Sequence, residues 1–173
     1  MEKIISTQLT EYLENNNVLN ESRYAYRNNS SIEQALENVT EQIYKHIDKG
    51  KSSLLAILDL SKAFDSVNHD LLLNKLDQLN IDSTWFASYL HGRTHSVKID
   101  NIMSEAKSNL YGVPQRSILC PILFNIFIND IPKIHALPEI TTSTTIYADD
   151  VQLLFSGSHN NLEQLKISAQ SKE

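Results

Sequence analysis

The sequence contains little cysteine, and it has no long apolar run. The single cysteine, Cys120, excludes an internal disulfide and indicates an intracellular protein, without distinguishing nucleus from cytoplasm. No apolar stretch approaches about 18 residues, and no charged segment precedes an apolar one at the N-terminus, so neither a membrane span nor a signal peptide is indicated. At 173 residues the chain has the length of one domain with a substantial core.

Positive charge is also scarce. The chain has 15 Lys and Arg against 21 Asp and Glu, which gives a formal net charge of −6. Proteins that bind nucleic acid usually neutralise phosphates with Lys and Arg, so the overall charge argues against binding by electrostatic attraction alone. The function therefore has to be sought in the arrangement of the acidic residues.

Two adjacent aspartates, Asp149 and Asp150, follow Tyr147 and Ala148 between two β-prone stretches. This pattern predicts a β-hairpin with both carboxylates at its tip. At a separation of about 4 Å and an effective dielectric near 20, two such charges repel by about 4 kcal/mol. Such a pair is either well solvated or neutralised by a cation, and its oxygen ligands suit Mg²⁺.

A third carboxylate, Asp59, ends the apolar run 54–58, which is typical of a buried strand. It opens a block that extends to Val67, and a further block, 112–124, precedes the hairpin. The three blocks, in this order, resemble motifs A, B and C of reverse transcriptases. The similarity is greatest to polymerases of jockey- and LINE-type non-LTR retrotransposons, and it runs from about Leu9 to the last residues.

The resemblance implies an α+β fold. We expect a polymerase palm, an antiparallel sheet backed by helices in an RRM/ferredoxin-like arrangement, together with part of the fingers. Residues 1–50 would form a fingers-to-palm segment and residues 51–173 the palm, as one partial domain. A thumb and an endonuclease, which belong to the same polyprotein in this family, are missing from the sequence. An acidic charge fits a palm without such basic neighbours.

The resemblance also implies an activity, RNA-directed DNA polymerisation, with an RNA template, a DNA primer and a dNTP as partners. Asp59 and Asp149 would bridge two Mg²⁺ (or Mn²⁺) ions, with Asp150 supporting the site. Nucleotide-binding positions would be supplied by all three blocks and by one upstream arginine: Phe64, Gln115, Tyr147, Ala148 and Arg27. Phe64 would exclude a 2′-hydroxyl from the incoming sugar, and a plain core phenylalanine is the alternative.

Basic residues have two open interpretations. Arg27 could grip a triphosphate or be a solvated surface residue. Arg93, His95 and Lys98 form a basic cluster that could contact template-primer phosphates or lie on a solvated edge strand. His69 is interpreted as a helix cap or surface residue, and Asp65 as a residue of local structure.

Three family glycines are replaced in this chain, by Ala25, Arg116 and Cys120. Glycine is used where the backbone approaches a ligand or adopts an unusual dihedral. We expect Arg116 to begin the motif B helix and to face the nucleotide cleft, where it would either obstruct the site or hold a phosphate.

The remaining pattern is helical. Ser31 and Gln34 predict a capping box, followed by an apolar face packed beneath the Asp59 strand. That face comprises Ile32, Ala35, Leu36, Val39, Ile43 and Ile47. Further helices are predicted around residues 4–13, 71–79 and 85–90, and an alternating strand at 96–99.

Three functional hypotheses follow. The first is an RNA-directed DNA polymerase palm, and the second is a catalytically dead remnant that only binds metal or nucleic acid. The third is a metal-dependent cyclase or other phosphotransferase on a palm-like fold. Residues 113–115, Val-Pro-Gln, argue against the third, because such enzymes are expected to lack motif B.

Overall fold

The computed structural model describes residues 1–28, 30–131, 140–158, 163 and 167. The chain divides into two compact units, each assembled from two separated stretches. The sheet unit consists of Leu19–Ser61 and Asn129–Glu173, and the helical unit consists of Met1–Val18 and Lys62–Ile128. Among the described residues there are five α-helices and only antiparallel sheets, which confirms the mixed α+β class.

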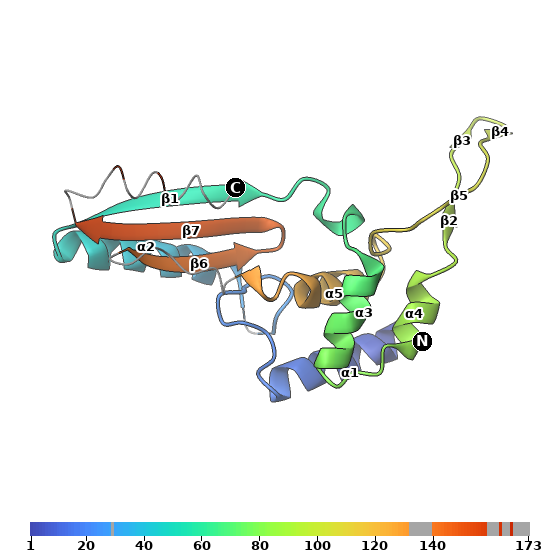
Figure 1. Cartoon of the computed structure of the whole chain (residues 1–173), viewed down its shortest axis with the longest axis horizontal. Coiled ribbons are helices and arrows are strands. Elements are labelled where there is room, and N and C mark those ends of the chain that lie inside the picture. Colours follow the sequence, from blue (N-terminus) through green and yellow to red (C-terminus); the bar gives the residue numbers. More distant parts are fainter. Residues whose placement is uncertain (29, 132–139, 159–162, 164–166, 168–173) are drawn as a thin grey trace. The chain divides into compact units, whose positions relative to one another are not determined.

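The sheet unit contains three antiparallel strands in the order β1-β7-β6 (Figure 1). Strand β1 spans Lys51–Asp59, β6 spans Thr141–Tyr147 and β7 spans Asp150–Ser158. The central strand β7 pairs with β1 along its whole length, from Lys51 opposite Ser158 to Asp59 opposite Asp150. Residues 151 and 153–157 of this central strand are all buried.

Helix α2, Ile32–Asp48, packs against β1 and β6. The predicted capping box is confirmed: the Gln34 N–H donates to Ser31 Oγ at 3.3 Å, and the Ser31 N–H donates to Gln34 Oε1 at 3.0 Å. Past the helix end, Gly50 adopts a φ of +65°, a left-handed conformation that stops helices. The sequence therefore predicted the start of this helix correctly.

The predicted buried face of α2 was wrong in part. Ala35 and Val39 are buried, but Ile32 and Ile47 are exposed, and Leu36 is 66% exposed. The helix meets the sheet through small and polar side chains instead, which contact the strands by hydrogen bonds. Three of these are Asn38 Nδ2 to Thr145 Oγ1 at 3.4 Å, His46 Nδ1 with Ser53 Oγ at 3.0 Å, and His46 Nε2 with Ser156 Oγ at 3.1 Å.

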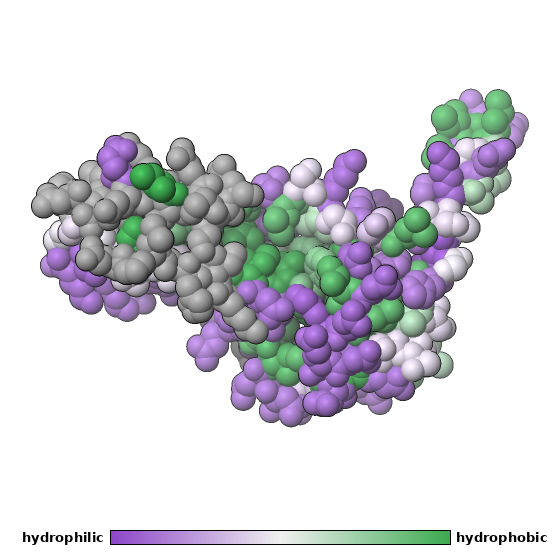
Figure 2. Space-filling view, in the orientation of Figure 1, coloured by the Kyte–Doolittle hydropathy of each residue, from purple (hydrophilic) through white to green (hydrophobic). Residues whose placement is uncertain are grey.

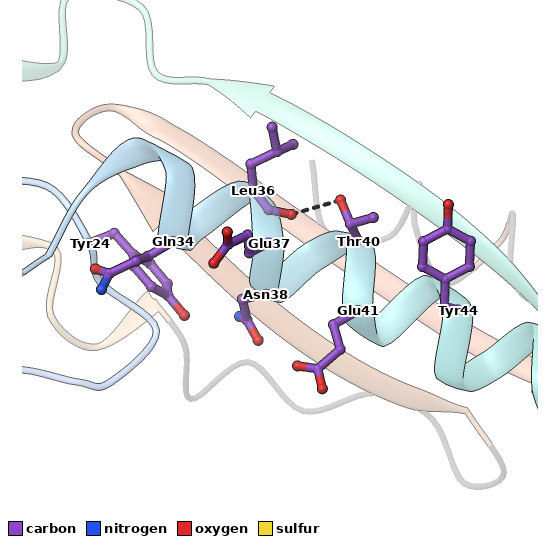
Figure 3. A pocket seen from close by; sticks show the side chains of 8 residues that line it. All are labelled: Tyr24, Gln34, Leu36, Glu37, Asn38, Thr40, Glu41 and Tyr44. Atoms are coloured by element: carbon purple, nitrogen blue, oxygen red, sulfur yellow. Dashed lines mark hydrogen bonds between the residues drawn. The ribbon is translucent and has the colours of Figure 1, made fainter.

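A cavity of about 830 Å³ lies along α2 (Figure 3). Its described lining runs along the helix and includes Tyr24, Gln34, Leu36, Glu37, Asn38, Thr40, Glu41 and Tyr44. Two of these are linked, because the Thr40 hydroxyl donates to the carbonyl oxygen of Leu36 at 2.8 Å. None of the predicted catalytic aspartates lines this cavity, so it does not mark the expected site of chemistry.

The helical unit contains α1 (Glu2–Asn15), the short 3₁₀ helix η1 (Ala63–Asp65), α3 (His69–Gln78), α4 (Thr84–Leu90) and α5 (Cys120–Phe127). Helix α3 packs against both α4 and α5. Its Leu72 and Leu76 are fully buried, as is Leu123 of α5, and burying a leucine contributes about 1.5–3 kcal/mol. Tyr12 of α1 donates its hydroxyl to the carbonyl oxygen of Leu79 at 2.8 Å, which joins α1 to the end of α3.

After α4 the helical unit extends an arm, residues 93–109 (Figure 1). Strand β2 (Thr94–His95) pairs with β5 (Lys107–Ser108), and β3 (Lys98–Ile99) pairs with β4 (Ile102–Met103). The predicted strand at 96–99 is thus only partly formed, because the ladder is interrupted between these two short pairs. The outer end of the arm is apolar, as Figure 2 shows, and Ile102 is 77% exposed there.

No helix within the described residues is long and apolar enough to cross a membrane.

Candidate active site

The three candidate catalytic aspartates lie at one end of the sheet. Asp59 is the last residue of β1 and its cross-strand partner is Asp150, the first residue of β7. Asp149 precedes Asp150 in the turn that joins β6 to β7, and its carbonyl oxygen accepts from the Leu60 N–H at 3.4 Å. Directly opposite residues point to the same face of a sheet, with Cβ atoms about 4.5–5.5 Å apart. The backbone thus brings Asp59 and Asp150 together.

A tight turn between β6 and β7 presents these aspartates. Tyr147 pairs with Asp150, so that Ala148 and Asp149 form a two-residue loop. Ala148 has a φ of +55°, and a positive φ at the first loop residue is typical of type II′ hairpins, whose twist matches that of the strands. The hairpin prediction is confirmed, with Asp149 in the two-residue turn and Asp150 as the first residue of β7.

Solvent reaches this end of the sheet. Asp59 and Asp150 are exposed and Asp149 is half-buried. In the described part of the chain, no three or more His, Cys, Asp or Glu side chains are grouped so that they could hold a metal ion. The oxygen donors of a carboxylate pair nevertheless fit Mg²⁺, which binds proteins through as few as one or two carboxylates and fills its shell with water and phosphate oxygens.

The motif B loop is attached to the segment that follows motif A. The Val113 N–H donates to Phe64 O at 2.9 Å, and the Gly112 N–H donates to Val67 O at 2.8 Å. A Cβ at Gly112, whose φ is +87°, would lie 2.9 Å from Asp65 Cα, so this position requires glycine. The loop is therefore held against residues 64–67 by backbone contacts.

His69 also holds this loop. It is buried, and its Nε2 lies 2.8 Å from the carbonyl oxygen of Gly112. A carbonyl can only accept, so Nε2 carries the proton. The interpretation as a helix cap or surface residue was wrong, because Asn68 caps α3 through its side chain.

Phe64 and Gln115 have defined contacts within the helical unit. The Phe64 ring is half-buried and lies 4.4 Å from the ring of Phe124, centroid to centroid. Gln115 is exposed, and its Nε2 donates to Asp65 Oδ1 at 2.7 Å. Their predicted contacts with a nucleotide stay predictions, because the candidate catalytic aspartates belong to the sheet unit, and each unit is described separately.

Arg116 does not begin a helix, and that prediction was wrong. Helix α5 starts at Cys120, after a turn in which Ser117 Oγ accepts from the Cys120 N–H at 3.1 Å. Arg116 is exposed and has a φ of +67°, a backbone conformation that residues other than glycine rarely adopt. The backbone thus keeps the glycine conformation although the residue is arginine.

Cys120, the second replaced glycine of motif B, is almost fully buried. Burial, and secondarily the negative charge of Asp65, raise the pKa of its thiol to about 11. The thiol therefore stays protonated at neutral pH and behaves as a small apolar group.

The upstream segment passes next to β6. Backbone hydrogen bonds join Ile146 to both Ser22 and Tyr24. Ala25 is buried and Tyr26, not Ala25, has a positive φ, of +57°. The glycine replaced at position 25 is therefore not needed for a left-handed backbone.

Sequence reasoning missed Arg23. Its side chain is 1% exposed, and burial, then the nearby charge of Arg27, lower its pKa to about 10. Arg27 itself is half-buried, with Nη1 donating to Asn20 O at 3.1 Å. No sequence signal separates the buried arginine from the half-buried one four positions later.

The basic residues Arg93, His95 and Lys98 are spread along the arm. Arg93 lies over the Tyr89 ring, 4.5 Å from its centroid, and its Nε donates to the Tyr89 carbonyl at 2.8 Å. His95 Nδ1 contacts Asn109 Oδ1, and Lys98 is exposed on β3. Arg93 and His95 thus both have defined contacts with neighbouring residues.

Residues 1–172 match the family model described as reverse transcriptase (RNA-dependent DNA polymerase). The match covers almost the whole chain and includes the aspartate-bearing strand, the motif B loop and the hairpin. The chain belongs to the reverse transcriptase family, a family of nucleotidyltransferases.

Individual relatives point to transposable elements. A probable RNA-directed DNA polymerase from transposon BS of Drosophila melanogaster is 28% identical over 161 residues, which cover 90% of this chain and 18% of that protein. The RNA-directed DNA polymerase from mobile element jockey of the same species is 28% identical over 159 residues, which cover 89% of this chain and 17% of that protein. The chain thus spans less than a fifth of these relatives, and the predicted relationship to jockey-type non-LTR elements is confirmed.

Proposed function

We propose that this chain carries the catalytic palm of an RNA-directed DNA polymerase, which transfers a deoxynucleotide to a primer 3′-hydroxyl on an RNA template. The observation that carries the proposal is the pairing of Asp59 with Asp150, directly beside Asp149. Asp59 and Asp149 would hold two divalent ions, and Asp150 would support them.

Bound there, Mg²⁺ or Mn²⁺ would activate the primer hydroxyl and stabilise charge on the triphosphate and the leaving pyrophosphate. The chain's own residues bind and orient the substrates. Phe64 would exclude ribonucleotides by its bulk, Gln115 would contact the incoming nucleotide, and Arg27 the triphosphate. Arg93, His95 and Lys98 would contact the phosphates of template and primer inside the cell. A thumb and an endonuclease of the same polyprotein would complete the machinery.

A second candidate function is a catalytically dead remnant that only binds metal or nucleic acid. It is favoured by one observation, Arg116 in a left-handed conformation where the family has glycine. A long cation at this position would hinder the approach of a nucleotide or displace a metal ion.

Primer extension on an RNA template, with Mg²⁺ and separately with Mn²⁺, tests the two candidates. Asp149→Asn should abolish extension, whereas Asp48→Asn, which removes an exposed acid at the opposite end of the sheet unit, should not. Metal binding is followed separately as a rise in melting temperature with added Mg²⁺.

The outcomes are distinct. Extension that depends on Asp149 supports the polymerase. A Mg²⁺ response that depends on Asp149, without extension, supports the remnant. A Mg²⁺ response that is equal in the Asp149→Asn and Asp48→Asn variants contradicts the polymerase and a remnant that binds metal at Asp149.

A further inference from the structure

The side chains of Asp65 and Gln115 form a hydrogen bond on the surface of the helical unit. Gln115 Nε2 lies 2.7 Å from Asp65 Oδ1, and both residues are exposed. An ionised carboxylate can only accept, so the amide must turn its nitrogen towards Asp65. The opposite orientation would set the amide oxygen against the carboxylate. The acceptor oxygen of Asp65 therefore keeps the Gln115 amide nitrogen facing it, so that the amide oxygen points away.

The backbone on both sides of this bond is already held. Gly112 and Val113 donate to the carbonyl oxygens of Val67 and Phe64, and Gly112 lies directly against the backbone of Asp65. The remaining freedom of Gln115 is in its side-chain dihedrals. A glutamine side chain in water samples many rotamers, and ordering it has an entropic cost. The bond to Asp65 removes that freedom before any ligand arrives.

The bond adds little to folding stability, because an exposed hydrogen bond replaces equally good bonds to water. Its setting suggests a different role. Asp65 and Gln115 both line a cavity of about 230 Å³, whose wall also contains Arg93 and Asn109. The amide oxygen and the second N–H of Gln115 are thus left beside a polar cavity with donors and acceptors around it.

We propose that Asp65 is a positioning residue for Gln115, which holds the amide in the orientation that receives the incoming nucleotide. The inference rests on the proposed function, because it assumes that Gln115 contacts a nucleotide. It assigns Asp65 a role beyond local structure and without any part in metal binding. Without Asp65, Gln115 has to be ordered by the nucleotide itself, which weakens binding.

The direction in which the Kd for the nucleotide changes when Asp65 is removed distinguishes a positioning role from a purely electrostatic one. A nucleoside triphosphate is strongly anionic, so removal of a nearby carboxylate should strengthen its binding by charge alone. Loss of a positioning contact should weaken it. The expected size is about two- to tenfold in Kd, the ordering cost of one flexible side chain.

The test uses the full chain with a fluorescent dNTP and Mg²⁺. Asp65→Ala should raise Kd about two- to tenfold, whereas Asp65→Asn, whose amide oxygen can still accept from Gln115, should bind nearly as the parent does. Gln115→Ala should raise Kd, and adding Asp65→Ala to it should change nothing further. Asp77→Ala removes an exposed acid on α3 as a charge-matched control, and melting temperatures should be nearly equal throughout. The inference is overturned if Asp65→Ala binds as tightly as the parent or more tightly, or if the two alanine effects add.

A second measurement needs no nucleotide. The heteronuclear NOE of the Gln115 side-chain amide should report a rigid group in the parent and in Asp65→Asn, and a mobile one in Asp65→Ala. An unchanged NOE in Asp65→Ala overturns the positioning role. If the parent fails to bind nucleotide while the NOE still depends on Asp65, the proposed function fails and the positioning of Gln115 stands.

Discussion

Replacing Arg116 by glycine should stabilise the chain. Arg116 has a φ of +67°, and an L-residue in this region is disfavoured by about 1–2 kcal/mol because its Cβ crowds the carbonyl oxygen. Glycine has no Cβ and avoids this cost, but it loses about 0.5–1 kcal/mol more chain entropy on folding. The net gain in the free energy of unfolding is therefore up to about 1.5 kcal/mol. Had a helix begun at Arg116, as the sequence predicted, glycine would instead have lowered the stability by its chain entropy.

The assay is thermal unfolding of the parent, Arg116→Gly and Arg116→Ala. For a chain of this length 1 kcal/mol shifts the melting temperature by about 2–4 °C, so the glycine variant should melt up to about 6 °C higher. The alanine variant removes the guanidinium but keeps the Cβ, and it should melt no higher than the parent. Equal melting of the glycine and alanine variants would refute the argument from backbone strain. Binding of Mg²⁺ and dNTP, measured separately, should be tighter for the glycine variant.

Three further predictions concern Gly112, His46 and Phe64. Gly112→Ala should lower stability in urea unfolding by about 2 kcal/mol or more, since the new Cβ meets Asp65 backbone at 2.9 Å; an unchanged midpoint would contradict this. Burial, then the charges of Lys51 and Lys49, lower the pKa of His46. The neutral His46 side chain therefore stabilises the folded chain at pH values above the pKa of an unfolded histidine, and this contribution to the free energy of unfolding declines as the pH falls below about 6.5. His46→Gln should flatten that decline in a series of melting curves, and an identical pH profile would exclude it. In a polymerising chain, Phe64→Ala should incorporate ribonucleotides more readily, and unchanged discrimination would return Phe64 to a purely structural role.

The arrangement of the aspartates could be predicted because it depends on local patterns. The apolar run before Asp59 specifies a strand that ends at an acid, although the strand is not buried as predicted, since Leu55 is 37% and Ile57 63% exposed. The β-prone stretches around Asp149 and Asp150 specify a hairpin with a short turn. Strand pairing then places both at one end of the sheet. The same reasoning predicted the start of α2, because capping residues act within one turn of the helix.

Features that depend on distant partners could not be predicted in this way. His69 contacts a carbonyl 43 positions away, and nothing in its own neighbourhood indicates this. Helix α2 carries two apolar stripes, and the sequence does not say that the sheet contacts the stripe with Ala35 and Val39. The positive φ of Arg116 could not be predicted either, because arginine residues rarely adopt this backbone conformation.

The pairing of β1 with β7 affects the order in which the sheet can form during synthesis. Hairpin β6–β7 is local, but the partner of Lys51 is Ser158, and that of Asp59 is Asp150. At about 5–20 residues per second, a ribosome needs roughly 5–20 s to add the intervening stretch of about 100 residues. Throughout this interval the apolar residues 54–58 have been made but their strand partner has not. A nascent chain is therefore expected to depend most on chaperones while the helical unit is being translated.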